Sequence, residues 1–174
     1  MIGSGGLVVM DENTCMVEVA RFFMNFTQNE SCGKCVPCRE GTKRMLEILE
    51  RIVAGNGQKG DVELLLDLAD TISSTALCGL GKTAAMPVVS TIKNFRDEYD
   101  AHIIDKKCPA GQCKKLVTYY IGPELCKGCS KCARNCPVEA ISGEIKSPFK
   151  IDTSKCIKCG ACVENCNFGA VKEV

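Results

Sequence analysis

Two stretches near the C-terminal end, CKGCSKCARNCPVEAI (residues 126–141) and CIKCGACVENCNFGAV (residues 156–171), decide the fold of this part of the chain. They align without a gap at an offset of 30 residues. Repetition within so short a segment predicts two copies of one small unit that pack against each other. Each copy has the spacing C-x2-C-x2-C-x3-C, with Cys126, Cys129, Cys132 and Cys136 in the first and Cys156, Cys159, Cys162 and Cys166 in the second.

This cysteine spacing is typical of a protein that binds iron–sulfur cubanes. A cubane needs four thiolates that converge from different directions. Three cysteines on one tight loop can reach three irons, so the fourth ligand must come from elsewhere. A pair of four-cysteine zinc sites is the alternative, but zinc sites rarely need three cysteines in a C-x2-C-x2-C step. The pattern therefore favours two [4Fe–4S] clusters.

The segment resembles the bacterial 2[4Fe–4S] ferredoxins, in which the fourth cysteine of each run ligates the other cluster. On these positions the resemblance implies one cluster held by Cys126, Cys129, Cys132 and Cys166 and another held by Cys136, Cys156, Cys159 and Cys162. Cluster binding would then tie both halves together and supply much of the folding free energy. One departure is visible: Pro137 follows Cys136 as expected, whereas Asn167 follows Cys166.

Composition restricts the class of protein further. The chain has 15 cysteines among 174 residues, an odd number concentrated in CxxC steps, which indicates metal ligation in a reducing compartment rather than a disulfide framework. We therefore expect a cytoplasmic protein. The net charge of +1 argues against a nucleic-acid partner. We also expect no membrane partner and no secretory signal, because no long apolar run is present.

The first hundred residues have the apolar periodicity of helices. We expect one helix from Asp11 to about Met24, with Asp11 or Thr14 as N-cap, and a second after the Cys32–Cys38 loop, ended by Gly55. A third would be capped by Asp61, and a fourth would begin at Pro87 with Val88, Ile92, Phe95 and Tyr99 on one side. Four amphipathic helices with short connections predict a small bundle.

A third cysteine group lies in this helical part. Cys32, Cys35 and Cys38 repeat the three-cysteine step and open directly onto a helix, whose positive N-terminal end favours a negatively charged cluster. Cys78 is the candidate fourth ligand, because glycines at positions 79 and 81 let the backbone approach closely. A lone cysteine is otherwise a small buried hydrophobe. The open coordination position favours the ligand interpretation for Cys78.

Three cysteines remain, and two of them follow the chain's single histidine. His102, Cys108 and Cys113 are spaced as H-x5-C-x4-C, which is enough for most of a tetrahedral zinc site. Water, Cys15 or a neighbouring chain could supply the fourth ligand. The alternative is a histidine that ends the fourth helix beside incidental cysteines. Cys15 itself, among apolar neighbours on the first helix, is expected to be an unligated core thiol.

Three stretches of the helical part carry a second resemblance to a known family. ESCGKCVPCREGTKRMLEIL, ALCGLGKTAAMPVVSTI and FRDEYDAHI are similar to the C-terminal helical domain of the NADH-oxidising flavoprotein subunit of complex I. With the added ferredoxin, the chain resembles the beta subunit of electron-bifurcating [FeFe]-hydrogenases and NAD-linked formate dehydrogenases from about Gly3 onward. In that family the cysteines that match Cys32, Cys35, Cys38 and Cys78 ligate one [4Fe–4S] cluster. The family's NADH and FMN sites lie in an upstream domain. The GSGG at residues 3–6 is no dinucleotide motif, so we expect neither cofactor on this piece.

These inferences define the expected protein. Its fold class is α + (α+β), a four-helix bundle cluster domain followed by a bacterial-type 2[4Fe–4S] ferredoxin fold. The expected domains are residues 1–101, a linker with a zinc site at 102–118, and the ferredoxin at 119–174. The expected function is electron relay between an upstream flavin and a partner subunit or soluble ferredoxin, with no turnover by this chain alone. The alternative is a redox-silent, metal-stabilised structural or assembly module.

Overall fold

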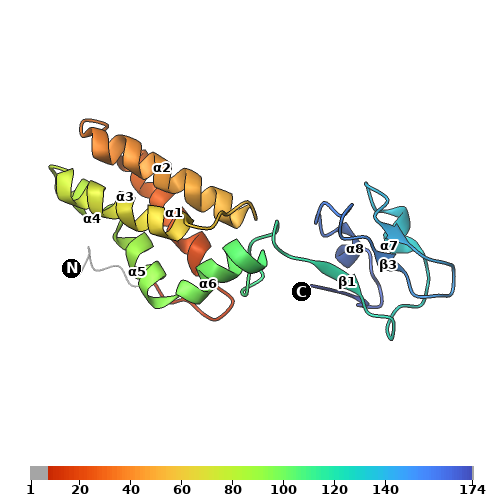
Figure 1. The fold of residues 1–174 in the computed structure, drawn as a ribbon. Coiled ribbons are helices and arrows are strands. Elements are labelled where there is room, and N and C mark those ends of the chain that lie inside the picture. The colour runs from red at the N-terminus through yellow and green to blue at the C-terminus, as the bar shows by residue number, and fades with distance from the viewer. Residues whose placement is uncertain (1–7, 174) are drawn as a thin grey trace. The chain divides into compact units, whose positions relative to one another are not determined.

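A computed structural model of the chain describes residues 8–173, so the glycine-rich residues 3–6 lie outside the described part. The chain divides into two units, one ending at Cys113 and the other beginning at Lys114. The first unit is helical and the second mixes short strands with short helices (Figure 1). The segment 102–118, expected to be a linker, is thus divided between the two units. Within the described residues, no helix is long and apolar enough to cross a membrane.

Three long helices and a series of shorter ones make up the first unit. They are α1 (Met16–Glu30), α2 (Val36–Val53), α3 (Asp61–Thr75), α4 (Gly79–Thr83), α5 (Met86–Asn94), α6 (Arg96–Asp100) and the π-helical segment η1 (Ala101–Asp105). The three expected long helices are therefore present. The fourth is not continuous, and the four-helix bundle is not confirmed. The break is at Phe95, whose φ of −136° and ψ of 42° are not helical. Its side chain is exposed, whereas Val88, Ile92 and Tyr99 are buried as expected.

The long helices bury their apolar faces against one another. α1 packs on α2 and α5, and α2 packs on α3. The most deeply buried side chains are Val17 and Met24 of α1, Met45, Leu49 and Ile52 of α2, and Leu65 and Ile72 of α3. Each fully buried side chain of this size contributes about 1.5–3 kcal/mol. This shared core fixes where the helix ends lie, and the helix ends carry the cysteines.

The helix starts differ from the expected ones for local reasons. Asp11 does not cap α1, because its carboxylate instead accepts hydrogen bonds from the Asn13 N–H at 3.1 Å and the Thr14 hydroxyl at 3.0 Å. α1 begins at Met16, whose N–H donates to the Glu98 carboxylate at 2.9 Å. Asp61 is the first residue of α3 rather than its N-cap. Its buried carboxylate pairs with the Arg51 guanidinium, which pins the start of α3 to α2.

Gly55 ends α2 as expected. It has a φ of +82°, and its N–H donates to Ile52 O at 3.0 Å while the Asn56 N–H donates to Arg51 O at 2.9 Å. This is the Schellman pattern, in which a left-handed residue just past the helix satisfies the last carbonyls.

The second unit repeats its elements at the spacing found in the sequence. Its strands are β1 (Tyr119–Ile121), β2 (Ile141–Ser142), β3 (Lys150–Ile151) and β4 (Val171–Glu173), and its helices are α7 (Lys131–Arg134) and α8 (Ala161–Glu164). β1 pairs antiparallel with β4, and β2 pairs antiparallel with β3. Each ladder thus joins a strand from one copy to a strand from the other. The two copies share one core that includes Val117, Tyr119, Ile121, Ile141, Phe149, Ala170 and Val171.

Candidate metal centres

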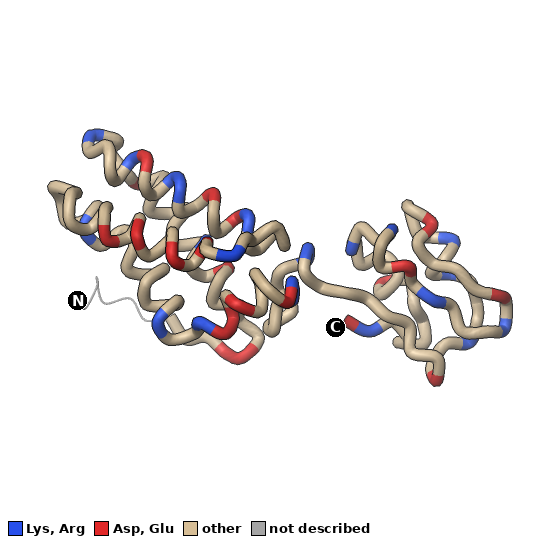
Figure 2. The backbone as a smooth tube through the Cα atoms, viewed as in Figure 1, with Lys and Arg blue, Asp and Glu red and all other residues tan. Residues whose placement is uncertain are grey.

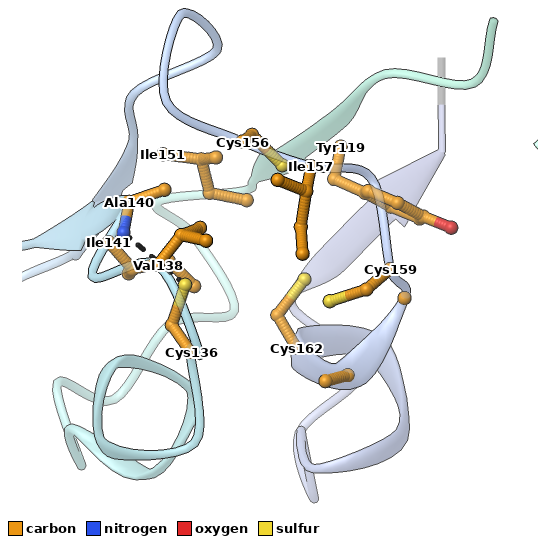
Figure 3. Close-up of a pocket in the computed structure, with 12 residues that line it drawn as sticks. Tyr119, Cys136, Val138, Ala140, Ile141, Ile151, Cys156, Ile157, Cys159 and Cys162 are labelled. Atoms are coloured by element: carbon orange, nitrogen blue, oxygen red, sulfur yellow. Dashed lines mark hydrogen bonds between the residues drawn. The ribbon is translucent and has the colours of Figure 1, made fainter. Parts of the chain in front are cut away.

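Two pockets in the second unit are each lined by four cysteines. One is lined by Cys136, Cys156, Cys159 and Cys162, and the other by Cys126, Cys129, Cys132 and Cys166. In Figure 3, Cys136 approaches the first pocket from one side and Cys159 and Cys162 from the other, with their sulfur atoms directed into the space between. Each pocket therefore combines three cysteines of one copy with the last cysteine of the other.

Short helices and backbone amides position these thiols. Cys132 lies on α7 and Cys162 lies on α8, and both are buried. The last cysteine of each copy accepts a backbone N–H at 3.3 Å, from Ala140 to Cys136 Sγ and from Ala170 to Cys166 Sγ. Such N–H donors stabilise a thiolate, which is the ligating form of cysteine.

Burial and backbone donors act in opposite directions on these groups. Burial raises the pKa of the Cys132 and Cys162 thiols. Burial also acts to raise the pKa of Cys166, but the surrounding backbone N–H groups, from Phe168 onward, outweigh it and lower the pKa. A bound cation would hold all of these groups as thiolates.

A third pocket lies in the helical unit and is also lined by four cysteines. Cys32, Cys35, Cys38 and Cys78 all border it. Cys35 is the N-cap of α2 and Cys78 is the N-cap of α4, so two helix starts face one cavity. α4 packs on α3 and α3 packs on α2, and Cys78 borders the same pocket as the three cysteines at the start of α2. Four thiols and no competing histidine are the donor set that an iron–sulfur cubane requires.

The glycines beside Cys78 have different roles. A side chain on Gly81 would come within 2.6 Å of Ala76 Cβ and 3.7 Å of Cys38 Sγ, so this position needs a glycine. A Cβ on Gly79 would meet nothing within 4 Å. The expected close backbone approach therefore applies to Gly81 and is wrong for Gly79.

A fourth group of metal-binding side chains is fully buried in the helical unit. It consists of Cys15, His102, Cys108 and Cys113, whose ligand atoms all lie within 4.8 Å of one another. His102 Nε2 is 3.3 Å from Cys15 Sγ and 3.4 Å from Cys113 Sγ. The Nδ1–H of His102 donates to Glu98 O at 2.6 Å, which leaves Nε2 directed at the sulfurs. A backbone carbonyl often orients a zinc-ligating histidine in this way.

Cys15 was expected to be a core thiol, with the fourth-ligand role as one of three alternatives, and the structure places it with the histidine and the other two cysteines. It is buried, as expected, but it is not an isolated core thiol: it joins the group that His102, Cys108 and Cys113 form. It stands just before α1, 87 residues from His102, and no spacing rule links the two. The sequence signal for its place in this group was that one cysteine remained beside an incomplete ligand set, which is why Cys15 was one of the candidate fourth ligands.

The spacing and electrostatics of this group fit zinc. A tetrahedral zinc with sulfurs at about 2.3 Å separates two sulfurs by about 3.8 Å, and Cys15 Sγ and Cys113 Sγ are 3.8 Å apart. The hydrogen bond with Cys113, together with His102, lowers the pKa of Cys15 despite its burial. Burial acts to lower the pKa of His102, but the contact with Cys15 outweighs it and raises the pKa. The group therefore favours a thiolate at Cys15.

Comparison with known proteins identifies both units. Residues 18–102 match the NADH-ubiquinone oxidoreductase-F iron–sulfur binding region, and residues 118–167 match a 4Fe-4S dicluster domain. The chain is 55% identical over 148 residues to NADP-reducing hydrogenase subunit HndC of Solidesulfovibrio fructosivorans, covering 85% of this chain and 30% of that protein. It is 48% identical over 109 residues to an NADH-quinone oxidoreductase subunit of Mycobacterium tuberculosis H37Rv, covering 63% of this chain and 24% of the relative.

A solved structure is also similar. The NAD+-reducing [NiFe]-hydrogenase in the H2-reduced state aligns with a TM-score of 0.53 and 34% identity, over 55% of this chain and 17% of that one. The chain thus spans less than a third of the relatives it matches. Residues 18–102 match the iron–sulfur binding region of NADH-ubiquinone oxidoreductase-F and residues 118–167 match a 4Fe-4S dicluster domain, so the chain is an iron–sulfur electron-transfer module.

Proposed function

We propose that this chain carries three [4Fe–4S] clusters and relays single electrons within an NAD-linked oxidoreductase. The observation that carries the proposal is the presence of three pockets, each lined by four free cysteines. The ligand sets are Cys32, Cys35, Cys38 and Cys78 in the helical unit, then Cys126, Cys129, Cys132 and Cys166, then Cys136, Cys156, Cys159 and Cys162. Bound there, the clusters supply sites that accept and release one electron at a time.

The chain's own residues hold the clusters and shield them from water. In the helical unit, Ala76 and Leu80 line the cysteine pocket together with the four thiols. In the second unit, Ile151 and Phe149 play the same part in the two pockets. An apolar wall restricts solvent access, and solvent access is one of the factors that set a cluster's potential.

In the complete protein we propose that electrons come from a flavin reduced by NADH or NADPH, bound outside residues 1–174, and go to a partner subunit or a soluble ferredoxin. A hydrogenase is the favoured parent complex. The helical unit ends at Cys113, so the 148-residue match to the hydrogenase subunit necessarily extends into the second unit. That breadth favours a hydrogenase-type, electron-bifurcating complex over a respiratory one. The fifteen free cysteines support a reducing compartment such as the cytoplasm.

We further propose that Cys15, His102, Cys108 and Cys113 bind one zinc ion. Four buried ligand atoms within 4.8 Å of one another support the site. Zinc is redox-inert and closed four-coordinate sites are structural. Its role here is to tie η1 and the segment after it to the start of α1.

Dithionite reduction of the anaerobically purified chain tests the electron-transfer function. A module with three cubanes is brown, and its visible absorbance bleaches when dithionite is added and returns on reoxidation. The competing function is a redox-silent structural module whose cysteines bind only zinc. That protein is colourless and does not change with dithionite, and this result would contradict the proposal.

A further inference from the structure

The two cysteine pockets of the second unit are related by the internal repeat, but their walls differ in polarity. The pocket with Cys156 is also lined by Ile157 (Figure 3), and by Gly160 and Ala161. At the corresponding positions the pocket with Cys126 is lined by Lys127 and Ser130, and Asn165 borders it as well. A cation and a hydroxyl group therefore border one pocket where an isoleucine and a glycine border the other.

The difference in charge extends along the whole of each motif. Residues 126–136 contain Lys127, Lys131 and Arg134 and no acidic residue, a formal charge of +3. Residues 156–166 contain Lys158 and Glu164, a formal charge of 0. Lysines, arginines and acidic residues are otherwise interspersed along both units (Figure 2). The first motif is thus three charges more positive than the second, although their cysteines align one to one.

One of these cations, Lys131, is held by Asn167, the residue that departs from the pattern expected after the last cysteine of the repeat. Lys131 Nζ donates to the side-chain oxygen of Asn167 at 3.1 Å. Lys131 precedes Cys132 and Asn167 follows Cys166, and these two cysteines border the same pocket. In the other copy the corresponding residues are Ala161 and Pro137, which cannot form this contact. The departure at Asn167 therefore holds the solvent-exposed Lys131 ammonium beside the residues that adjoin Cys132 and Cys166, a contact that the other copy lacks.

The pocket of Cys136, Cys156, Cys159 and Cys162 has one contact that acts in the opposite direction. The N–H of Lys158 donates to Cys156 Sγ at 3.4 Å. The Lys158 ammonium itself donates to Lys115 O at 2.8 Å. Glu139 lies three residues after Cys136, whereas the residue three positions after Cys166 is the uncharged Gly169. Of the residues that line these two pockets, Lys127 is the only charged one, and it lines the pocket of Cys126.

We infer that the pocket of Cys126, Cys129, Cys132 and Cys166 holds the cluster with the higher reduction potential of the two. This rests on the proposed cluster ligands. Reduction adds one negative charge, which nearby cations stabilise by Coulomb attraction. Net charge and hydrogen bonding are among the factors that set cluster potentials. Lys127, Lys131 and Asn167 are the residues that make the two pockets unequal.

The consequence is that the two clusters of the domain differ in reduction potential. When the unit carries one electron, that electron resides in the pocket beside Lys131. When a second electron enters, the other pocket holds it at lower potential, from which it can be donated to a strongly reducing acceptor. An electron that passes from the pocket of Cys156 to the pocket of Cys126 leaves the cluster in the former oxidised by one electron and the cluster in the latter reduced by one. No side chain changes redox state.

An EPR-monitored redox titration of the full chain tests the inference. The step of the helical-unit cluster is identified as the one that a Cys78→Ser variant lacks. The two remaining steps should differ by at least about tenfold in reduction equilibrium constant, which is about 59 mV for one electron. Lys127→Ile with Lys131→Ala should lower the higher step and leave the lower one in place. The reverse exchange, Ile157→Lys with Ala161→Lys, should raise the lower step.

Two outcomes would overturn the inference while leaving the proposed function intact. One is a pair of steps at the same potential in the unmodified chain. The other is a Lys127→Ile, Lys131→Ala variant that retains all its iron and in which both steps stay in place. An unmodified second unit that binds no iron would instead overturn the proposed function, and the inference with it. Asn167→Pro, which copies Pro137, should produce a smaller fall in the higher step than the double lysine variant.

Discussion

Cys15 Sγ lies 3.3 Å from His102 Nε2, although 87 residues separate them in the sequence. The start of α1 and the segment after α6 meet at this contact, and Cys108 and Cys113 complete the group. A buried set of three thiols and one imidazole with no cation would combine several partly charged groups in an apolar interior. A zinc ion removes that cost by neutralising the thiolates.

Removing Cys15 should release the zinc. In a Cys15→Ala variant the zinc affinity of the chain should fall by at least about 100-fold, because loss of even an outer partner of a ligand costs up to that factor. Zinc per chain, measured by mass spectrometry after dialysis against a mild chelator, checks this. The matched control is Val17→Ala in α1, two residues after Cys15, which empties a buried position and costs on the order of 2 kcal/mol while retaining zinc. Equal zinc in both variants would show that Cys15 is not a ligand.

Cys78 should be required for the cluster in the helical unit and for no other. A Cys78→Ser variant should lose about four iron atoms per chain and keep about eight, because its pocket is separate from those of the second unit. Iron analysis and the EPR signal of the reduced protein measure the loss. Leu77→Ser, at the exposed neighbouring position, should keep all of its about twelve iron atoms per chain. A Cys78→Ser protein with its full iron would mean that Cys78 is an ordinary thiol.

The crossed ligand sets of the second unit predict how many clusters each double cysteine variant loses. Cys126 and Cys166 border one pocket, so changing both to serine should remove one cluster and leave about eight iron atoms per chain. Cys126 and Cys136 border different pockets, so changing both should remove two clusters and leave about four. Each double variant is the other's control. The opposite result would mean that each motif ligates its own cluster.

Crowding at Gly128 should matter more than backbone strain alone. Gly128 and Gly169 have φ values of +65° and +59°, so alanine at either is strained by about 1–2 kcal/mol. Only at Gly128 would the new Cβ also meet backbone, 2.5 Å from the Ser147 nitrogen. We expect Gly128→Ala to cost a further 1–3 kcal/mol or so. Thermal unfolding and iron release to a chelator compare the two variants, and equal destabilisation would contradict this.

The sequence predicted the second unit almost completely, because its information is local and repeated. The offset between Cys126 and Cys156 also relates α7 to α8 and β1 to β3 in the structure. The crossed cysteine sets followed from the resemblance to bacterial ferredoxins, and each of the two pockets brings one of these sets of four cysteines together. What the pattern could not reveal is the Lys131–Asn167 contact, which depends on how the two copies face each other.

The helical unit was harder to predict because tertiary contacts set its helix ends. Met16 starts α1 because Glu98, which is 82 residues away, accepts its N–H. Phe95 interrupts the expected fourth helix, although its position fits the apolar spacing of a helix that continues through it. Tyr99 remains buried after the break, with its hydroxyl 2.8 Å from Thr91 Oγ1. Apolar periodicity shows which side chains are buried and does not show whether the backbone between them stays helical.

The most direct test of the account is the content of iron, acid-labile sulfide and zinc per chain in anaerobically purified protein. Three cubanes and one zinc site predict about twelve iron, about twelve sulfide and about one zinc. About eight iron with intact ferredoxin spectra would contradict the ligand set of Cys32, Cys35, Cys38 and Cys78. Zinc without iron would contradict the electron-transfer function itself.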